Sequence, residues 1–229
     1  MAFLGDQILE FLRQLKLDVP LPRGIQVMNP YQDPATFPLC HQFYRKYYSD
    51  RNTRILIIGI NPGRFGGGLT GIPFTDPIRL QTICEIQNDL PKKSELSSEF
   101  IYRMMNELGG EQEFYKRFYF TSVSPLGFTE KGKNLNYYDN PNLARRLKPF
   151  MIKCLQTQLA WGMNRDVAFC LGEGDNFKFL STLNNEHRFF GKIIPLAHPR
   201  FIMQYRRKKL TEYIRYYQEK LNLPETDVS

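Results

Sequence analysis

Residues 55–75 read ILIIGINPGRFGGGLTGIPFT, and the rest of the chain is expected to be organised around this stretch. A short β-branched apolar run over residues 54–60 ends at Asn61, as in a buried parallel strand that leads into a loop. Five glycines follow, and they allow the backbone to approach a ligand closely. Phe65 and Phe74 are the large flat side chains nearby, so we expect the ligand to be flat as well.

Length and composition predict a single globular domain over residues 1–229, of which 42% are hydrophobic and 24% charged. The formal charge of +8 favours an anionic partner, with nucleic acid ahead of an acidic membrane surface. No apolar run approaches the roughly 20 residues that span a bilayer, and the N-terminus lacks the features of a signal peptide. We therefore expect a cytoplasmic protein without membrane contact.

The four cysteines are widely spaced and form no CxxC pair: Cys40, Cys84, Cys154 and Cys170. This spacing favours reduced thiols in the core over a metal or iron–sulfur site. We expect neither a metal ion nor a cofactor.

Hydrophobic periodicity predicts helices alternating with short strands. Helices are expected over residues 2–16, 41–48, 97–108, 142–163, 176–183 and 206–221, and strands over residues 54–60, 117–123, 166–171 and 192–196. Residues 1–24 form an N-terminal helix and linker, residues 24–38 an irregular stretch, and residues 224–229 a disordered tail. Pro149 is expected to kink the long helix or to begin a new one.

Strands separated by helices predict a three-layer αβα fold around a central four-stranded, mainly parallel sheet. Ligands of such sheets bind at the carboxyl ends of the strands. All four predicted strands end in polar or glycine loops, which bring Asn61, Ser122, His198 and Arg200 to one edge. The sequence therefore predicts a site at this edge, and it contains neither the GxGxxG nor the GxxxxGK[ST] nucleotide-binding pattern.

Each of these residues also has a structural interpretation. Asn61 could cap the turn after its strand, His198 could be a satisfied structural histidine, and Phe74 could belong to the core. Their shared position at one sheet edge favours a functional site.

At these residues the sequence resembles the uracil-DNA glycosylase superfamily, and within it the single-strand-selective monofunctional family, most closely its bacterial second subgroup. The first matching motif comprises residues 59–63 followed by residues 70–74, and the second is His198-Pro199-Arg200. The segments VMNPY and FTSVSP also match, so the resemblance covers residues 28–207.

The resemblance implies that Asn61 positions the attacking water and that His198 hydrogen-bonds O2 of the departing base. It also implies that Phe74 stacks on the flipped base, and that backbone N–H groups near Ile60 and Gly63 line the pocket. Ser122 departs from the family pattern, because many members place an asparagine there to read the base edge. The implied activity is hydrolytic excision of uracil from DNA by a monofunctional base excision repair enzyme, acting as a monomer, with other deaminated or oxidised bases as further candidates.

The segment after His198 is expected to contact DNA. Apolar groups in it could wedge into the base stack, and a basic run could contact flanking phosphates; the residues are Arg200, Phe201, Ile202, Met203, Tyr205, Arg206, Arg207, Lys208 and Lys209. The structural alternative is a solvated helix terminus over buried aromatics. Two other functions stay open at this point: a nucleotide-binding α/β protein of different chemistry, and a DNA-binding module without catalysis.

Overall fold

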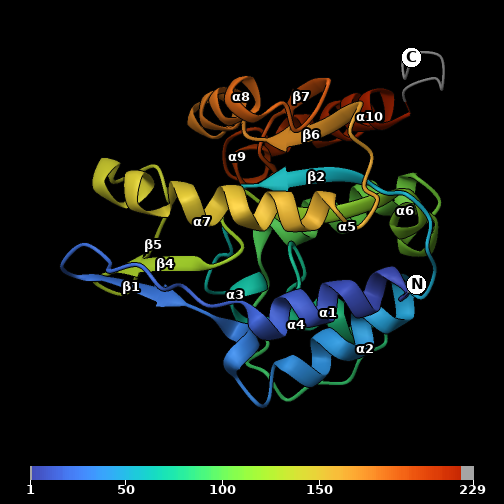
Figure 1. Ribbon diagram of the computed structural model, residues 1–229. Helices are drawn as coiled ribbons and strands as arrows, with labels where there is room; N and C mark the ends of the chain where they lie inside the picture. The colour runs from blue at the N-terminus through green and yellow to red at the C-terminus, as the bar shows by residue number, and fades with distance from the viewer. Residues whose placement is uncertain (1, 223–229) are drawn as a thin grey trace.

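A four-stranded parallel sheet forms the centre of the computed structural model, which describes residues 2–222 (Figure 1). Its strands are β2 (Ile55–Gly59), β3 (Phe118–Ser122), β6 (Val167–Leu171) and β7 (Lys192–Leu196), in the order β3-β2-β6-β7. The inner strands β2 and β6 are almost continuously apolar and buried, as parallel strands covered on both faces must be. The predicted sheet and its four strands are confirmed.

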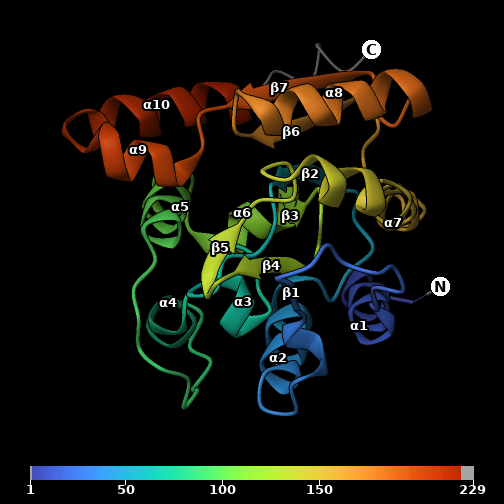
Figure 2. The same cartoon turned by 90° about the vertical axis from the view of Figure 1, so that its left-hand side faces the viewer.

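Helices cover both faces of this sheet. Figure 2 shows α7 (Pro141–Leu159) on one side, and α5 (Leu96–Glu107) and α10 (Leu210–Leu221) on the other. The remaining longer helices are α1 (Leu4–Gln14), α2 (Phe37–Tyr47), α6 (Glu111–Arg117) and α8 (Asp175–His187). The three-layer α/β architecture is therefore confirmed.

A second, antiparallel sheet lies beside the first and was not predicted. It contains β1 (Ile25–Met28), β4 (Gly127–Glu130) and β5 (Lys133–Leu135), in the order β1-β4-β5. The prediction of an irregular stretch over residues 24–38 is wrong for β1. Lys131 and Gly132 join β4 to β5 with φ angles of 49° and 73°, which suits the tight twist of a two-residue hairpin loop.

Several helices begin with a polar cap followed by proline, which has no N–H to leave unpaired at the first helical position. Asp76 caps α4 (Pro77–Thr82), Asn140 caps α7, and His198 caps α9 (Pro199–Tyr205). The two remaining short elements near the glycine loop are the 3₁₀ turn η1 (Pro30–Gln32) and the helix α3 (Gly67–Thr70).

The structure corrects one helix prediction and excludes one of the two alternatives for another. The helix expected from residue 206 is preceded by α9, then by the 3₁₀ turn η2 (Arg207–Lys209), and α10 begins only at Leu210. No new helix begins at Pro149, which lies inside the continuous α7. The tail expected to be disordered, residues 224–229, lies outside the described residues.

The four cysteines are buried free thiols, as predicted. Burial raises the pKa of Cys40 and Cys170 to about 12, so these thiols stay protonated and behave as apolar side chains. Among the described residues, no helix is long and apolar enough to cross a membrane.

Candidate active site

Asn61 follows β2 directly, and distant backbone groups hold its carboxamide. Its Oδ1 accepts a hydrogen bond from the Tyr137 N–H at 3.0 Å, and its Nδ2 donates to the Leu135 carbonyl at 3.2 Å. Both partners come from the segment at the end of β5, more than 70 residues along the chain, so the side chain does not cap a local turn. The oxygen and the nitrogen of the carboxamide can each make a second hydrogen bond. Asn61 can therefore still hold a water molecule.

His198 lies at the end of the loop after β7 and caps α9. Its Nδ1 accepts a hydrogen bond from the Arg200 N–H at 3.1 Å. Burial, together with the nearby Arg200 guanidinium, lowers the pKa of His198 to about 4. The imidazole is therefore neutral at physiological pH, and because Nδ1 is the acceptor, the proton is on Nε2. His198 thus acts as a helix cap through one nitrogen and as a hydrogen-bond donor through the other.

Phe74 is the aromatic wall of the site. Its backbone has a φ of 54°, a conformation that costs energy for a bulky residue and is often found at functional sites. The ring packs on Phe120, with centroids 5.1 Å apart, and lies 6.3 Å from the ring of His198. A Cβ at position 59 would come within 2.9 Å of the Phe74 ring, so the ring position requires Gly59.

These residues surround a cavity of about 310 Å³ at the carboxyl edge of the sheet. The site residues expected from the sequence that line it are Ile60, Asn61, Gly63, Phe74, Ser122, His198, Arg200, Phe201 and Tyr205. Ser122 pairs with Gly59 across β2 and β3, and its Oγ lies 3.5 Å from the position of a Cβ at Gly59, the position that the Phe74 ring also approaches. The described residues contain no cluster of His, Cys, Asp or Glu that could hold a metal ion.

Several lining residues were missed from the sequence: Glu95, Asn134, Asn136, Tyr138 and Gln204. Three of them belong to β5 and the turn after it, and they depend on the antiparallel sheet that was not predicted. Glu95 immediately precedes α5, where an acidic residue ordinarily indicates only the start of a helix.

The exposed face of α9 forms the rim of the cavity. Phe201 and Tyr205 are 40% and 62% exposed, and their rings lie 5.7 Å apart. The expected contact of Ile202 and Met203 with DNA is corrected, because both side chains are buried in the core at 0% and 2% exposure. Helical periodicity explains the difference, since residues 201 and 205 share one face of the helix and their neighbours share the other.

The predicted basic run is exposed and partly paired. Arg206 stacks over the Phe201 ring at 5.3 Å, Arg207 forms an ion pair with Glu99 at 3.1 Å, and Lys208 is exposed. Exposed ion pairs of this kind contribute little to stability. These side chains remain candidates for phosphate contacts.

A fixed carboxamide, a neutral imidazole donor and an aromatic wall thus surround one cavity at the carboxyl edge of the sheet. A family model described as the uracil DNA glycosylase superfamily matches residues 45–222. The chain therefore belongs to the uracil DNA glycosylase superfamily.

The crystal structure of wild-type Pedobacter heparinus SMUG2 superposes with a TM-score of 0.94. The match covers 96% of this chain and 97% of that chain at 45% sequence identity. The family and activity implied by the resemblance, a uracil DNA glycosylase of base excision repair, are thereby confirmed.

Proposed function

We propose that the protein hydrolyses the N-glycosidic bond of deoxyuridine in DNA, with Asn61 and His198 as its catalytic pair. The observation that carries this proposal is the hydrogen bond from the Arg200 N–H to Nδ1 of His198, which leaves the ring proton on Nε2. The donor at Nε2 is then available to a base stacked on Phe74. The reaction is monofunctional in this proposal, because hydrolysis by water leaves an intact abasic site.

Bond cleavage moves negative charge onto the departing uracil and positive charge onto the sugar. A fixed donor aimed at the uracil O2 stabilises this anion. A single donor of this type lowers the activation barrier by about 3 to 4 kcal/mol. Because the pKa of His198 is about 4, the donor is a neutral imidazole and does not protonate the base. Asn61 orients the attacking water through the hydrogen-bonding positions that Leu135 and Tyr137 leave open.

Base selection is proposed to rest on Ser122 and Gly63. Ser122 presents a single hydroxyl, which can donate or accept, so it discriminates between base edges less strictly than a carboxamide that makes paired contacts. Gly63 leaves space where a side chain would meet Asn134, whose Nδ2 lies 3.4 Å from the position of a Cβ. We expect uracil to be the main substrate and 5-substituted uracils and other deaminated bases to be tolerated.

A strand-cleavage assay tests the activity. The protein is incubated with an oligonucleotide containing one uracil, and alkali then converts abasic sites into strand breaks. We expect a break at uracil only after alkali, and none in the matched thymine oligonucleotide. A nucleotide-binding protein of other chemistry or a DNA-binding module without catalysis would give no break, and a break before alkali would contradict the monofunctional reaction.

DNA is the substrate and partner in this proposal. We expect the enzyme to act as a monomer. We also propose that it acts in the cytoplasm on chromosomal DNA, as a nucleoid-associated activity if the source is bacterial.

A further inference from the structure

The cavity contains a carboxyl group that the catalytic pair does not use. Glu95 is the single acidic side chain among the described residues that line it, and His198 and Arg200 line the same cavity. Asn61 can orient a water molecule, but its carboxamide cannot accept a proton from it at neutral pH. Hydrolysis requires that the attacking water lose a proton, so a carboxylate in this position has a chemical use.

The Glu95 carboxylate is packed against the glycine loop that follows Asn61. A Cβ at Gly66 would collide with Glu95 Oε2, so Gly66 allows this close approach. The other oxygen, Oε1, lies 4.0 Å from the position of a Cβ at Gly63, two residues after Asn61. Both carboxylate oxygens therefore face the same loop that presents Asn61.

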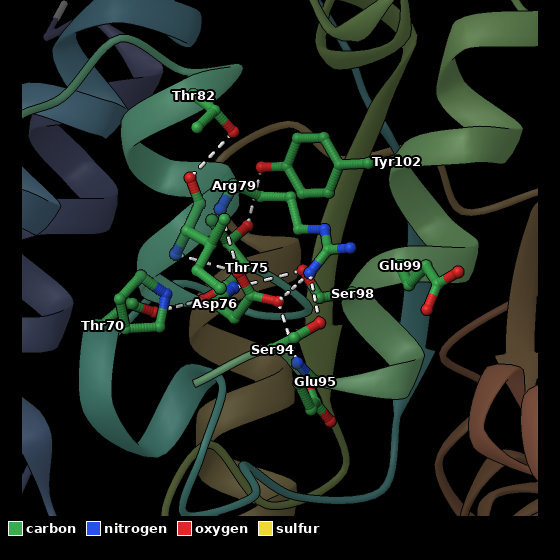
Figure 3. Close-up of polar contacts among 12 residues, drawn as sticks. Thr70, Thr75, Asp76, Arg79, Thr82, Ser94, Glu95, Ser98, Glu99 and Tyr102 are labelled. Atoms are coloured by element: carbon green, nitrogen blue, oxygen red, sulfur yellow. Dashed lines mark hydrogen bonds and ion pairs between the residues drawn. The ribbon is translucent and has the colours of Figure 1, made fainter. Parts of the chain in front are cut away.

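Hydrogen bonds around the buried Asp76 carboxylate fix the backbone of Glu95 (Figure 3). Asp76 is fully buried, and its Oδ2 accepts hydrogen bonds from the Glu95 N–H at 2.9 Å and from Arg79 at 2.6 Å. The Asp76 N–H donates to Ser98 Oγ at 3.2 Å, and Arg79 also donates to Ser94 Oγ at 2.7 Å.

Figure 3 shows the Glu95 side chain directed away from this network. Asp76 lies two residues after Phe74, so one buried carboxylate couples the aromatic wall of the cavity to the segment that carries Glu95. These contacts hold the backbone position from which the Glu95 side chain extends toward the cavity.

We propose that Glu95 is a further catalytic residue, whose carboxylate accepts the proton of the water that attacks C1′ of the sugar. The C1′–N1 bond breaks and its electron pair leaves with uracil, which the His198 Nε2–H stabilises. The water oxygen forms the new bond to C1′, one of its protons passes to Glu95, and Glu95 then releases that proton to solvent. This inference rests on the proposed function and adds a proton acceptor to it.

The groups facing Glu95 come from several elements. The pKa of Glu95 is raised to about 7, mainly by burial and further by the buried Asp76 carboxylate. The Ser97 hydroxyl and the guanidinium groups of Arg200 on α9 and Arg79 on α4 act in the opposite direction and lower this pKa. Arg64 and Lys133 line the neighbouring cavity of about 500 Å³, which Glu95 also borders. A carboxyl group that titrates near neutral pH is well matched to general base catalysis. His198 titrates about three pH units lower, so the two groups act in separate pH ranges.

The test compares single-turnover rates of uracil release between pH 5.5 and 9 for the wild type, Glu95→Gln and Glu95→Asp. We expect the wild-type rate to rise with pH to a plateau, with a midpoint near 7. Glu95→Gln should lose this rise and fall about 100-fold at the plateau, the scale of general base catalysis. Glu95→Asp should keep the rise at a reduced rate, and Glu107→Gln, which replaces an exposed acid at the far end of α5, should match the wild type.

Two controls separate a catalytic role from a structural one. Thermal unfolding should give the same midpoint for Glu95→Gln and the wild type, and both should bind DNA containing the uncleavable 2′-fluoro-2′-deoxyuridine within threefold of each other. A Glu95→Gln variant that keeps the wild-type pH profile would overturn this inference, as would one that loses only DNA affinity. A wild type inactive on uracil at every pH would overturn the proposed function itself, and this inference with it.

Discussion

The cavity and the exposed face of α9 hold their side chains in different ways, although His198 and Phe201 are only three residues apart. In the cavity, Asn61 is fixed by hydrogen bonds from the Tyr137 N–H and to the Leu135 carbonyl, and His198 by one from the Arg200 N–H. On the α9 face, Tyr205 is 62% exposed and Arg206 stacks on an exposed ring.

Preorganised groups lower a barrier because they need no rearrangement during the reaction. Mobile surface charges instead contribute to affinity, through the release of counterions from the phosphates. We therefore expect substitutions in the cavity to change the chemical step, and substitutions on the α9 face to change DNA binding and the extrusion of the base.

The largest expected effect is on the chemical step. His198→Ala and Asn61→Ala should each lower the single-turnover rate about 10²- to 10³-fold, because each removes an interaction that is made mainly in the transition state. Affinity for DNA containing an uncleavable uracil analogue should stay within a few-fold of the wild type. A large loss of affinity in either variant would contradict the expectation that the cavity residues act on the chemical step and not on DNA binding.

The two faces of α9 should respond in opposite ways to truncation. Ile202→Ala should lower the free energy of unfolding by about 2 to 5 kcal/mol, because it leaves a cavity in the core. Phe201→Ala and Tyr205→Ala should cost little stability but slow cleavage of paired more than of single-stranded DNA, since extrusion of a stacked base needs a wedge. Denaturant unfolding and cleavage of both substrates check this, and equal losses of stability would contradict it.

Smaller changes are expected in the choice of base. Ser122→Asn should increase the preference for uracil over xanthine and hypoxanthine by roughly tenfold, because paired contacts reject a wrong edge more strongly than one hydroxyl. Gly63→Tyr should abolish the tolerance of 5-hydroxymethyluracil by filling the space beside Asn134. Single-turnover rates on all four bases in one oligonucleotide are the measurement. Identical base profiles for the wild type and both variants would show that neither position faces the base.

The smallest effect is expected on the dependence of DNA affinity on salt. Neutralising Arg206 and Lys208 together should reduce the slope of log K against log salt by about 1 to 2, the value for one or two phosphate contacts. The matched control is Arg145→Gln with Lys148→Gln on α7, where Lys148 already pairs with Glu186 at 2.7 Å. A greater change of slope in the control would move the DNA-binding surface to α7.

The large sheet could be predicted because its strands are unusually apolar for their length. Every residue of β6 is buried, and the sequence of β2 is a β-branched run that stops at a polar turn. Parallel topology then brings the strand ends to one edge, which was enough to place Asn61, Ser122 and His198 around a common site.

The antiparallel sheet could not be predicted in the same way. Its strands are three or four residues long and half exposed, so they carry little periodic signal. A signal was present in the hairpin, where Gly132 follows Lys131 in a two-residue turn, but Lys-Gly is a weaker indicator than Asn-Gly. The missed sheet accounts for the missed backbone partners of Asn61 and for the missed Asn134.

Glu95 was missed for a different reason. Its importance depends on the close approach to Gly66 and on the buried Asp76, and both contacts join segments whose relative position the sequence does not reveal. The same limit applies to Ile202 and Met203, because α9, the helix on which they lie, was not predicted.

The central claim is that His198 is a neutral imidazole with its proton on Nε2. Folding lowers the pKa of His198 from its ordinary 6.5 to about 4. When the pH falls, His198 is therefore protonated in the unfolded chain before it is protonated in the folded protein. The stability that depends on neutral His198 is therefore complete above about pH 6.5 and is lost progressively as the pH approaches 4. The protonation state can be followed directly in the folded protein.

The measurement is a ¹⁵N NMR titration of the ring nitrogens of the three histidines, with His198 assigned from the signal that disappears in His198→Asn. We predict that at pH 7 the Nε2 of His198 carries the proton while Nδ1 is an acceptor, and that the ring titrates with a pKa of about 4. A midpoint near 6.5, or a proton on Nδ1 at pH 7, would contradict the account.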